Sequence, residues 1–478
     1  MKKFLAMLLA AVMVIGLAAC GSTPAETQAA AEAATQAVTE AATQAATEAA
    51  TEAAAKEVIE VNYYCSIGAY LATLQSEIDK FNEGEGKEKG IYINLISNIN
   101  SYGTDLNALM EAGTHYDIIH GDGRQDWYQK GWLMDLHKCN NPEIDALVES
   151  YKDCKIEGTS DNGDEALTIV TNAYPIKLAV NTDLFEKNNL ELPKTWDDVV
   201  ECAKVITENG NGIEFGFGWS TFSIQWRRLC FKFAINSTGT GWWNPNTASY
   251  DFSVFRKPAE AIRTMYENGW MLGADDLDID PIRAQFSEGV IGMFPAPSYD
   301  YAVYSEQFPA KCNWTVIDPP TIEEGEAPYK GVFFAGTGTM IDAVAYDAAD
   351  DAKKKAIEEA WLYINSDEVN QTAYEMGGII PTKTSIAAGA EVSEKLGPQW
   401  AIFGDLTNYA IMSQFPDSVI PLEGDDYETV FDSYMHGNVS FDDAVADLNK
   451  RYNDAYQILK QDGEIDTSIY EYEYDISR

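Results

Sequence analysis

The side chains that could bind a metal ion are spaced wrongly for a familiar metal site. The four histidines form no H-E-x-x-H pair, and no cysteine stands at zinc-ligand spacing from them. Asp276, Asp278 and Asp280 resemble the start of a calcium loop. However, Pro281 takes the sixth position, where glycine is needed, and Ser287 takes the twelfth, where glutamate is needed. We therefore expect no metal site.

Motifs for covalent catalysis and cofactor binding are also missing. The sequence has no G-x-S-x-G elbow, and the GTGTM segment at 336–340 lacks the third glycine of a dinucleotide-binding fingerprint. A glycosidase needs only two positioned carboxylates. Because 76 acidic residues always supply such a pair in sequence, a secreted glycosidase remains an alternative. We expect no catalytic residue and no cofactor.

Besides Cys20, the chain has six cysteines, and none of them forms a C-x-x-C pair. Cys139 and Cys154 are the closest in sequence, but so few cysteines in a chain of this length do not make a disulfide framework. We expect buried free thiols, although the sequence leaves open whether any of the six pair.

Aromatic side chains gather in one glycine-rich stretch. Four of the 11 tryptophans fall within a short span among glycines and polar residues, and not on an apolar helical stripe. They are Trp219, Trp226, Trp242 and Trp243. Such rings pack in a core or stack on the apolar face of a ligand, and both interpretations stay open for each tryptophan.

Composition excludes several classes of function. The 478 residues carry 76 Asp and Glu against 33 Lys and Arg, a formal net charge of −43. Such a surface repels phosphate backbones, so we expect no nucleic-acid partner. Apolar residues make up 46% of the chain, which is enough for a sizeable core.

The N-terminus resembles a bacterial lipoprotein signal. Lys2 and Lys3 precede an apolar run over 4–17, which is too short to span a bilayer, and the sequence LAACG follows at 17–21. This sequence resembles the lipobox, in which the cysteine is lipidated and becomes the first mature residue. We predict a signal peptide over 1–19 and a lipid anchor at Cys20. An ordinary signal peptide is the alternative.

The segment that follows is a spacer. From residue 32 it repeats four-residue units such as EAAT and QAVT, which place no fixed apolar face on a helix. We assign 20–57 as the lipidated cysteine and a low-complexity tether without a core of its own.

Strands and helices alternate beyond the tether. We expect strands at 58–65, 91–96 and 116–119, with helices at 71–81, 106–110 and 127–132. This spacing predicts parallel β-α-β units, whose ligands collect in the loops beyond the carboxyl ends of the strands. Those loops are 66–70 and 120–126.

Several motifs resemble the bacterial extracellular solute-binding proteins of the maltose-binding type. The segment NTDLFEKNNLELPKTWDD at 181–198 is the most specific of them. Within it, Thr195 with Asp198 three residues on, before an apolar run, predicts the start of a helix. The others are MEAGTHYDII at 110–119, GWLMDL at 131–136, FSEGVIGM at 286–293, AWLYINS at 360–366, GGIIPT at 377–382 and SFDDA at 440–444. They occur in the family's order over about 58–460.

The resemblance implies an α/β, periplasmic-binding-protein-like (type II) fold of two lobes with a hinge between them. The lobes would be 58–173 with about 335–378, and 174–334 with about 379–478. The implied crossings lie near 172–175, 333–338 and 376–382.

The resemblance also implies a function. The protein would capture a carbohydrate at the extracellular face of the cell membrane and deliver it to an ABC importer, as a monomer and not as an enzyme. A different solute, such as a peptide or a polyamine, is an alternative with the same fold. A passive adhesin is a weaker one.

Site residues follow from the same resemblance and from the sugar chemistry of aromatic and polar groups. Tyr299 falls where the family often places a stacking ring, and Asp122 falls in the loop after the third strand. We expect the ligand to contact Tyr70, Asp122, Arg124, Tyr174, Trp219, Trp242, Trp243, Tyr299 and Asp300.

The lipidation site gives the first testable prediction. Labelled fatty acid should be incorporated into the wild-type protein expressed in a bacterium, because the Cys20 thiol is the acceptor. The Cys20→Ser variant should carry no label, and label on that variant would contradict the assignment.

Overall fold

The computed structural model describes residues 58–65, 68–97, 104–122, 125–154, 161–162, 164–221, 230–234, 241–274, 276–324, 331–332, 337–406, 410–411 and 415–474. The chain divides into two units, Met1–Val58 and Ile59–Arg478, and the second carries the described fold. The predicted signal peptide, Cys20 and the whole tether lie outside the described residues. Within the described part, no helix is long and apolar enough to cross a bilayer.

The first sheet has four strands in the order β15-β3-β1-β2. Its strands are β1 (Ile59–Cys65), β2 (Ile91–Ser97), β3 (Ile118–Asp122) and β15 (Thr337–Ile341). β1 pairs in parallel with β2 and β3, which confirms the predicted parallel β-α-β units. β15 runs antiparallel to β3 and comes from much later in the chain.

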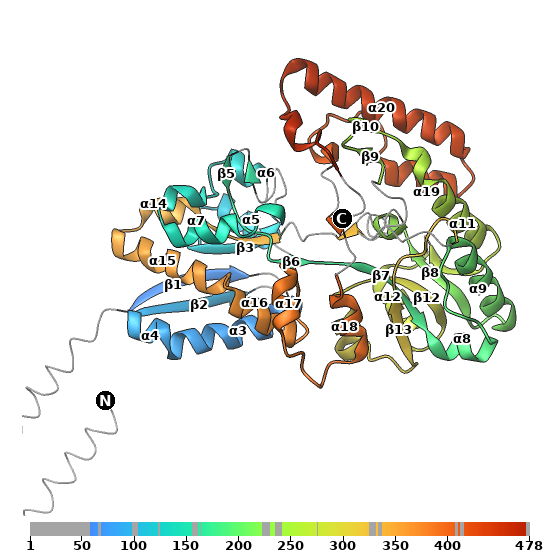
Figure 1. The fold of residues 1–478 in the computed structure, drawn as a ribbon, viewed down its shortest axis with the longest axis horizontal. Helices are drawn as coiled ribbons and strands as arrows, with labels where there is room; N and C mark the ends of the chain where they lie inside the picture. Colours follow the sequence, from blue (N-terminus) through green and yellow to red (C-terminus); the bar gives the residue numbers. More distant parts are fainter. Residues whose placement is uncertain are drawn as a thin grey trace, which may run out of the picture. The chain divides into compact units, whose positions relative to one another are not determined.

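Helices surround the first sheet, and several of them are visible in Figure 1. They are α3 (Gly68–Glu83), α4 (Glu85–Lys89), α5 (Thr104–Glu111), α6 (Gln125–Gln129), α7 (Pro142–Glu149), α14 (Ala343–Ala348), α15 (Asp351–Ile364) and α16 (Asp367–Glu375). One apolar cluster joins early side chains such as Val61 and Ile93 to late ones such as Trp361. The core of the first sheet is therefore completed by residues that follow the second sheet in sequence.

The second sheet has five strands in the order β11-β8-β12-β7-β13. Its strands are β7 (Ile176–Asn181), β8 (Phe215–Ser220), β11 (Met271–Ala274), β12 (Ile291–Pro297) and β13 (Trp314–Ile317). β12 is parallel to β8 and antiparallel to β7. The accompanying helices are α8 (Thr182–Asn188), α9 (Trp196–Asn209), α11 (Arg256–Glu267), α12 (Ile279–Ser287), α18 (Pro398–Gly404), α19 (Tyr427–Met435) and α20 (Phe441–Asp462).

Two predicted crossing segments hydrogen-bond to each other. β6 (Asn172–Ala173) pairs antiparallel with β16 (Ile380–Pro381). The backbone N–H of Thr382 also donates to the Thr171 carbonyl oxygen over 3.1 Å. The third predicted crossing falls largely outside the described residues, and the predicted lobe boundaries remain predictions.

Shorter elements complete the fold. The remaining strands pair as β4 (Asp161–Asn162) with β5 (Glu165–Ala166), β9 (Trp243–Asn244) with β10 (Ser249–Tyr250), and β14 (Gly331–Val332) with β17 (Ala410–Ile411). Short helices include η2 (Leu136–Cys139), α13 (Asp300–Ala302) and α17 (Thr384–Gly389). All six cysteines of this unit are free thiols, and four of them are buried.

The most specific sequence motif closes with a capping box. The Asp198 backbone N–H donates to the Thr195 hydroxyl over 3.2 Å, and the Thr195 backbone N–H donates to the Asp198 carboxylate over 2.9 Å. These two bonds satisfy backbone donors that a helix start leaves unpaired. The predicted start of α9 is confirmed, and the motif serves the scaffold.

Thr195→Ala should lower the free energy of unfolding by about 1 kcal/mol, because the Asp198 N–H loses its acceptor. Urea unfolding followed by tryptophan fluorescence measures the change. Thr195→Ser keeps the hydroxyl and serves as the control. An equal loss in both variants would contradict the capping role.

Candidate functional site

Two predicted site residues, Tyr174 and Tyr299, meet beside the paired crossing strands. Tyr174 follows β6, and Tyr299 lies between β12 and α13. Their ring centroids are 5.4 Å apart at an interplanar angle of 84°, the edge-to-face geometry that aromatic quadrupoles favour. Both side chains are half-buried. The pair thus presents partly accessible aromatic surface next to a predicted hinge strand.

Backbone and side-chain bonds hold both ends of this pair. The Asn172 amide donates to the Tyr174 hydroxyl over 3.2 Å. The Ser298 N–H donates to the Pro175 carbonyl oxygen over 3.0 Å. The segment before Tyr299 is therefore bonded directly to the segment after Tyr174.

Asp300, the neighbour of Tyr299, forms a buried ion pair with Arg283 of α12. The Asp300 side chain is fully buried, and its Oδ2 atom has no hydrogen-bond partner among the described residues. Burial raises the pKa of Asp300 to about 6, although the positive charge and hydrogen bond of Arg283 act in the opposite direction. Burial disfavours the charge on Arg283, yet Asp300 keeps the pKa of Arg283 above its ordinary value.

The three described candidate tryptophans lie in one apolar cluster. Trp219 of β8 is fully buried against Phe217 and Phe231, with ring centroids 6.0 Å apart in each case. Trp242 and Trp243 are also buried. Core packing, which the sequence left open, accounts for these contacts, and ligand binding by the three remains a prediction.

Trp242 and Trp243 each donate their indole N–H to a distant segment. Trp242 donates to Asp417 over 2.9 Å, and Trp243 donates to the Tyr470 carbonyl oxygen over 3.0 Å. The Tyr250 hydroxyl also donates to Asp417, over 2.6 Å. Burial raises the pKa of Asp417 to about 6, while these two donors oppose the rise.

Four other side chains that the sequence singles out lie outside the described residues. The predicted loops at 66–70 and 120–126 are shorter than expected, because Tyr70 is in the first turn of α3 and Asp122 ends β3. The side chains of both residues are not described. Arg124 and Trp226 are outside the described chain altogether. Their predicted roles stay predictions. The carboxyl end of β3 is placed by its pairing with β15, where Asp122 stands opposite Thr337.

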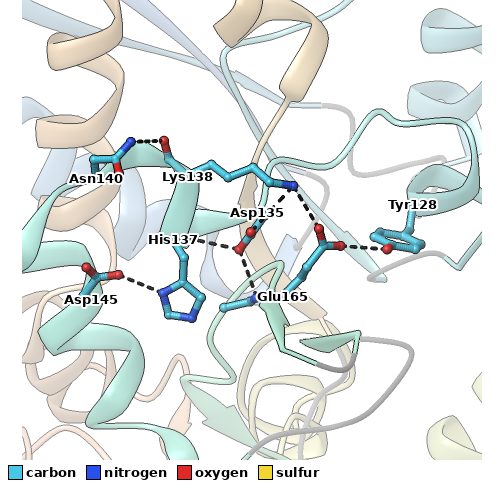
Figure 2. A network of polar contacts seen from close by, with 8 residues as sticks. Tyr128, Asp135, His137, Lys138, Asn140, Asp145 and Glu165 are labelled. Atoms are coloured by element: carbon cyan, nitrogen blue, oxygen red, sulfur yellow. Dashed lines mark hydrogen bonds and ion pairs between the residues drawn. The ribbon is translucent and has the colours of Figure 1, made fainter. Parts of the chain in front are cut away.

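A polar network supports the helix that follows the β3 loop (Figure 2). The Tyr128 hydroxyl of α6 donates to Glu165 over 2.7 Å, and the Lys138 ammonium of η2 donates to the same carboxylate over 2.9 Å. The Ala166 N–H donates to Asp135 over 3.2 Å. The hydrogen bond from Lys138, with that from Tyr128, lowers the pKa of Glu165. Because Lys138 is exposed, the network positions α6 more than it stabilises the fold.

Sequence reasoning missed Arg283 and Asp417. Both contact candidate residues through side chains that come from other elements, and no local motif marks either of them. The only signal for Arg283 was its proximity in sequence to Asp300, which has little weight in a chain so rich in charge.

Comparisons with known proteins point to one family. The family described as bacterial extracellular solute-binding protein matches residues 66–365, well over half of the chain. A fructooligosaccharide ABC transporter substrate-binding protein of Streptococcus pneumoniae is 26% identical over 217 residues, which are 38% of this chain and 39% of that protein. The match therefore spans about two fifths of the length of this curated relative.

Solved structures of sugar-binding proteins share the fold at low identity. A substrate-binding protein of Listeria monocytogenes in complex with cycloalternan has a TM-score of 0.59 at 19% identity, and the match covers 84% of this chain and 99% of that one. The GacH receptor of Streptomyces glaucescens, solved unliganded and with acarbose, has a TM-score of 0.61 at 15% identity, with 84% and 98% covered. The maltose-maltodextrin binding protein of Alicyclobacillus acidocaldarius has a TM-score of 0.58 at 14% identity, with 82% and 99% covered. The fold is the two-lobed type II α/β fold, as predicted.

The bond from Trp242 to Asp417 should make stability depend on pH in a specific way. The raised pKa means that the folded protein holds a proton on Asp417 at pH values where the unfolded chain has lost it. The stability due to this group is present below its ordinary pKa and is lost as the pH rises to about 6. Removing the Trp242 donor raises the pKa of Asp417 in the folded protein further, so the loss of stability continues to higher pH.

Trp242→Phe should therefore lower the free energy of unfolding by about 1–3 kcal/mol more at pH 8 than at pH 5, because the indole N–H bonds an ionised carboxylate more strongly than a neutral carboxyl group. Trp243→Phe is the matched control, since its acceptor is a carbonyl oxygen that does not titrate. Urea unfolding at both pH values measures the difference. A cost of Trp242→Phe that is the same at both would contradict this role of Asp417.

Proposed function

Because the chain belongs to the bacterial extracellular solute-binding proteins, we propose that it captures an oligosaccharide outside the cell and delivers it to the membrane-embedded subunits of an ABC importer. The observation that supports this most directly is the half-buried, edge-to-face pair of Tyr174 and Tyr299 beside the paired crossing strands. Sugar rings have apolar C–H faces that pack on such aromatic surface, while their hydroxyls bond to nearby polar groups.

The relatives support a sugar with several rings. The curated relative is named for fructooligosaccharides, and solved relatives are titled as complexes with raffinose and stachyose. We propose Tyr174 and Tyr299 as ligand contacts on one side of the site. Tyr70, Asp122 and Arg124 are proposed contacts at the carboxyl edge of the first sheet.

The location follows from the family and from the N-terminal sequence. We propose that the mature protein is a monomer anchored by lipid at Cys20 on the extracellular face of the cell membrane. The spacer over 20–57 would let the folded unit reach solutes and the importer. This arrangement rests on the lipobox resemblance and is tested by the labelling of Cys20.

A polyamine is the second candidate ligand, and the net charge of −43 favours it because a polycation is attracted to an acidic surface. Thermal-shift titration with raffinose, stachyose, nystose, maltotriose, spermidine and a tripeptide separates the ligand classes. A ligand at 100 times its dissociation constant should stabilise the fold by about 2.7 kcal/mol. Chromatography of the incubated sugars tests the glycosidase alternative, because a binding protein leaves them intact.

Tyr299→Ala should weaken the binding of the stabilising sugar about tenfold, because the ligand loses its aromatic contact. Isothermal titration calorimetry measures the affinity. Tyr92→Ala removes a well-exposed tyrosine of β2 and should leave the affinity unchanged. An unchanged affinity for Tyr299→Ala would remove Tyr299 from the proposed site. Stabilisation by spermidine alone would replace the sugar with a cation.

A further inference from the structure

We propose that Arg283 is a positioning residue for the ligand site: paired with Asp300, it fixes the turn that carries Tyr299 and so determines how Tyr299 meets the sugar. The proposal rests on the proposed function, since it assigns a specificity-determining role within the same site. Neither the sequence motifs nor the relatives assign any role to Arg283.

The guanidinium group of Arg283 bonds two carboxylates and lies near the Tyr299 ring. One N–H group donates to Asp300 Oδ1, and another donates to Asp280 Oδ1 over 3.2 Å. The guanidinium carbon lies 5.9 Å from the centre of the Tyr299 ring. This distance is at the limit of a cation–π contact. Any control of Tyr299 by Arg283 therefore acts mainly through Asp300.

Asp300 transmits that control through the backbone. It is the residue after Tyr299, and the two peptides between Ser298 and Asp300 lie inside a tight turn. The Tyr301 N–H donates to the Ser298 carbonyl oxygen over 3.1 Å, and the Ala302 N–H donates to the Tyr299 carbonyl oxygen over 3.2 Å. Fixing the Asp300 carboxylate therefore fixes the Tyr299 Cα–Cβ direction, which leaves the ring few rotamers.

The pair is poorly built for stability alone. Both side chains are buried, so both lose solvation, and Asp300 Oδ2 has no hydrogen-bond partner among the described residues. Buried ion pairs of this kind can often be replaced by apolar groups without loss of stability. The planar guanidinium fixes the orientation of the carboxylates that it bonds. An apolar replacement could not orient the Asp300 backbone in this way.

A ring held in place before binding gives a higher affinity than a mobile one. Ordering one mobile side chain at an interface weakens binding about two- to tenfold. Tyr174 limits the Tyr299 ring on one side, and the Arg283–Asp300 pair limits its backbone. Loss of the ion pair should therefore weaken sugar binding through Tyr299, because the proposal gives the fully buried Asp300 a positioning role in place of the ligand contact predicted from the sequence.

A double-mutant cycle tests this route. The first variant replaces the pair together, Arg283→Met with Asp300→Asn, so that no unpaired charge is left buried. The second is Tyr299→Ala, and the third combines them. Calorimetry with raffinose, stachyose and nystose should show a two- to tenfold loss for the pair replacement when Tyr299 is present. The loss should be less than twofold in the Tyr299→Ala background, because the pair then has no ring to position.

Additive losses would overturn the proposal, and they are the result expected if Asp300 contacts the sugar directly. Arg283→Lys keeps one charged N–H for Asp300 but not the planar fork, so it should retain part of the affinity. Arg263→Met is the matched control. Arg263 bonds Glu267 and lies 4.9 Å from the Tyr434 ring, so this variant removes a similar arginine contact elsewhere and should not change affinity.

Fluorine NMR of protein labelled with 3-fluorotyrosine supplies a readout without sugar. Tyr299→Phe identifies the Tyr299 resonance. In the pair replacement this resonance should shift and broaden, while Arg263→Met should leave it unchanged. An unshifted resonance would overturn the proposal. The wild-type protein could bind none of the three sugars while the pair replacement still shifts and broadens this resonance. That outcome would contradict the proposed sugar and leave the positioning role supported.

Discussion

The hydrogen bonds between β6 and β16 are the contact on which the candidate site depends. Ala173 stands opposite Ile380 and Asn172 opposite Pro381, and all four residues are buried. The Thr382 hydroxyl adds a bond to the Val170 carbonyl oxygen over 2.7 Å. β6 leads directly into β7 of the second sheet, whereas β16 follows α16, which packs on α3. The position of Tyr174 is thus set by two segments that are far apart in sequence.

Placing Tyr174 beside paired crossing strands has a consequence for binding. A ring attached to a hydrogen-bonded backbone loses little freedom when a ligand arrives, so less affinity is spent on ordering. Tyr299 has the same property, because the bond from Ser298 to Pro175 joins its turn to the segment after Tyr174. In the proposed site, the two tyrosines therefore form one preformed surface.

Local features of the fold were predictable from the sequence, while long-range ones were not. The first three strands and the Thr195 capping box depend on neighbours within a few residues, so periodicity and motif sufficed. Trp242 and Trp243 lie in a glycine-rich stretch that is typical of an exposed loop. They are buried because Asp417 and Tyr470, far along the chain, fold over them. No local pattern contains that information.

For the candidate site, too, the sequence could point to single residues but not to their long-range contacts. The family resemblance predicted Tyr299 and Asp300 as ligand contacts, which stays a prediction, and composition could not show that Asp300 is buried against Arg283. With 76 acidic residues, the sequence offers too many partners for each arginine. The family resemblance supplied the position of Tyr299, and only the fold supplied its contact with Tyr174.

The buried cations show how an acidic chain arranges its scarce positive charge. Among the described residues, Lys177 and Arg283 are the buried cationic side chains. Lys177 of β7 stands opposite Ala296 of β12 and bonds Asp318 over 2.8 Å, while Arg283 bonds Asp300 just beyond the same strand. Exposed ion pairs contribute little to stability, and buried ones mainly fix the orientation of the side chains that they join. Arg283 therefore constrains the short segment that carries Tyr299, whereas Lys177 joins β7 to the residue after β13.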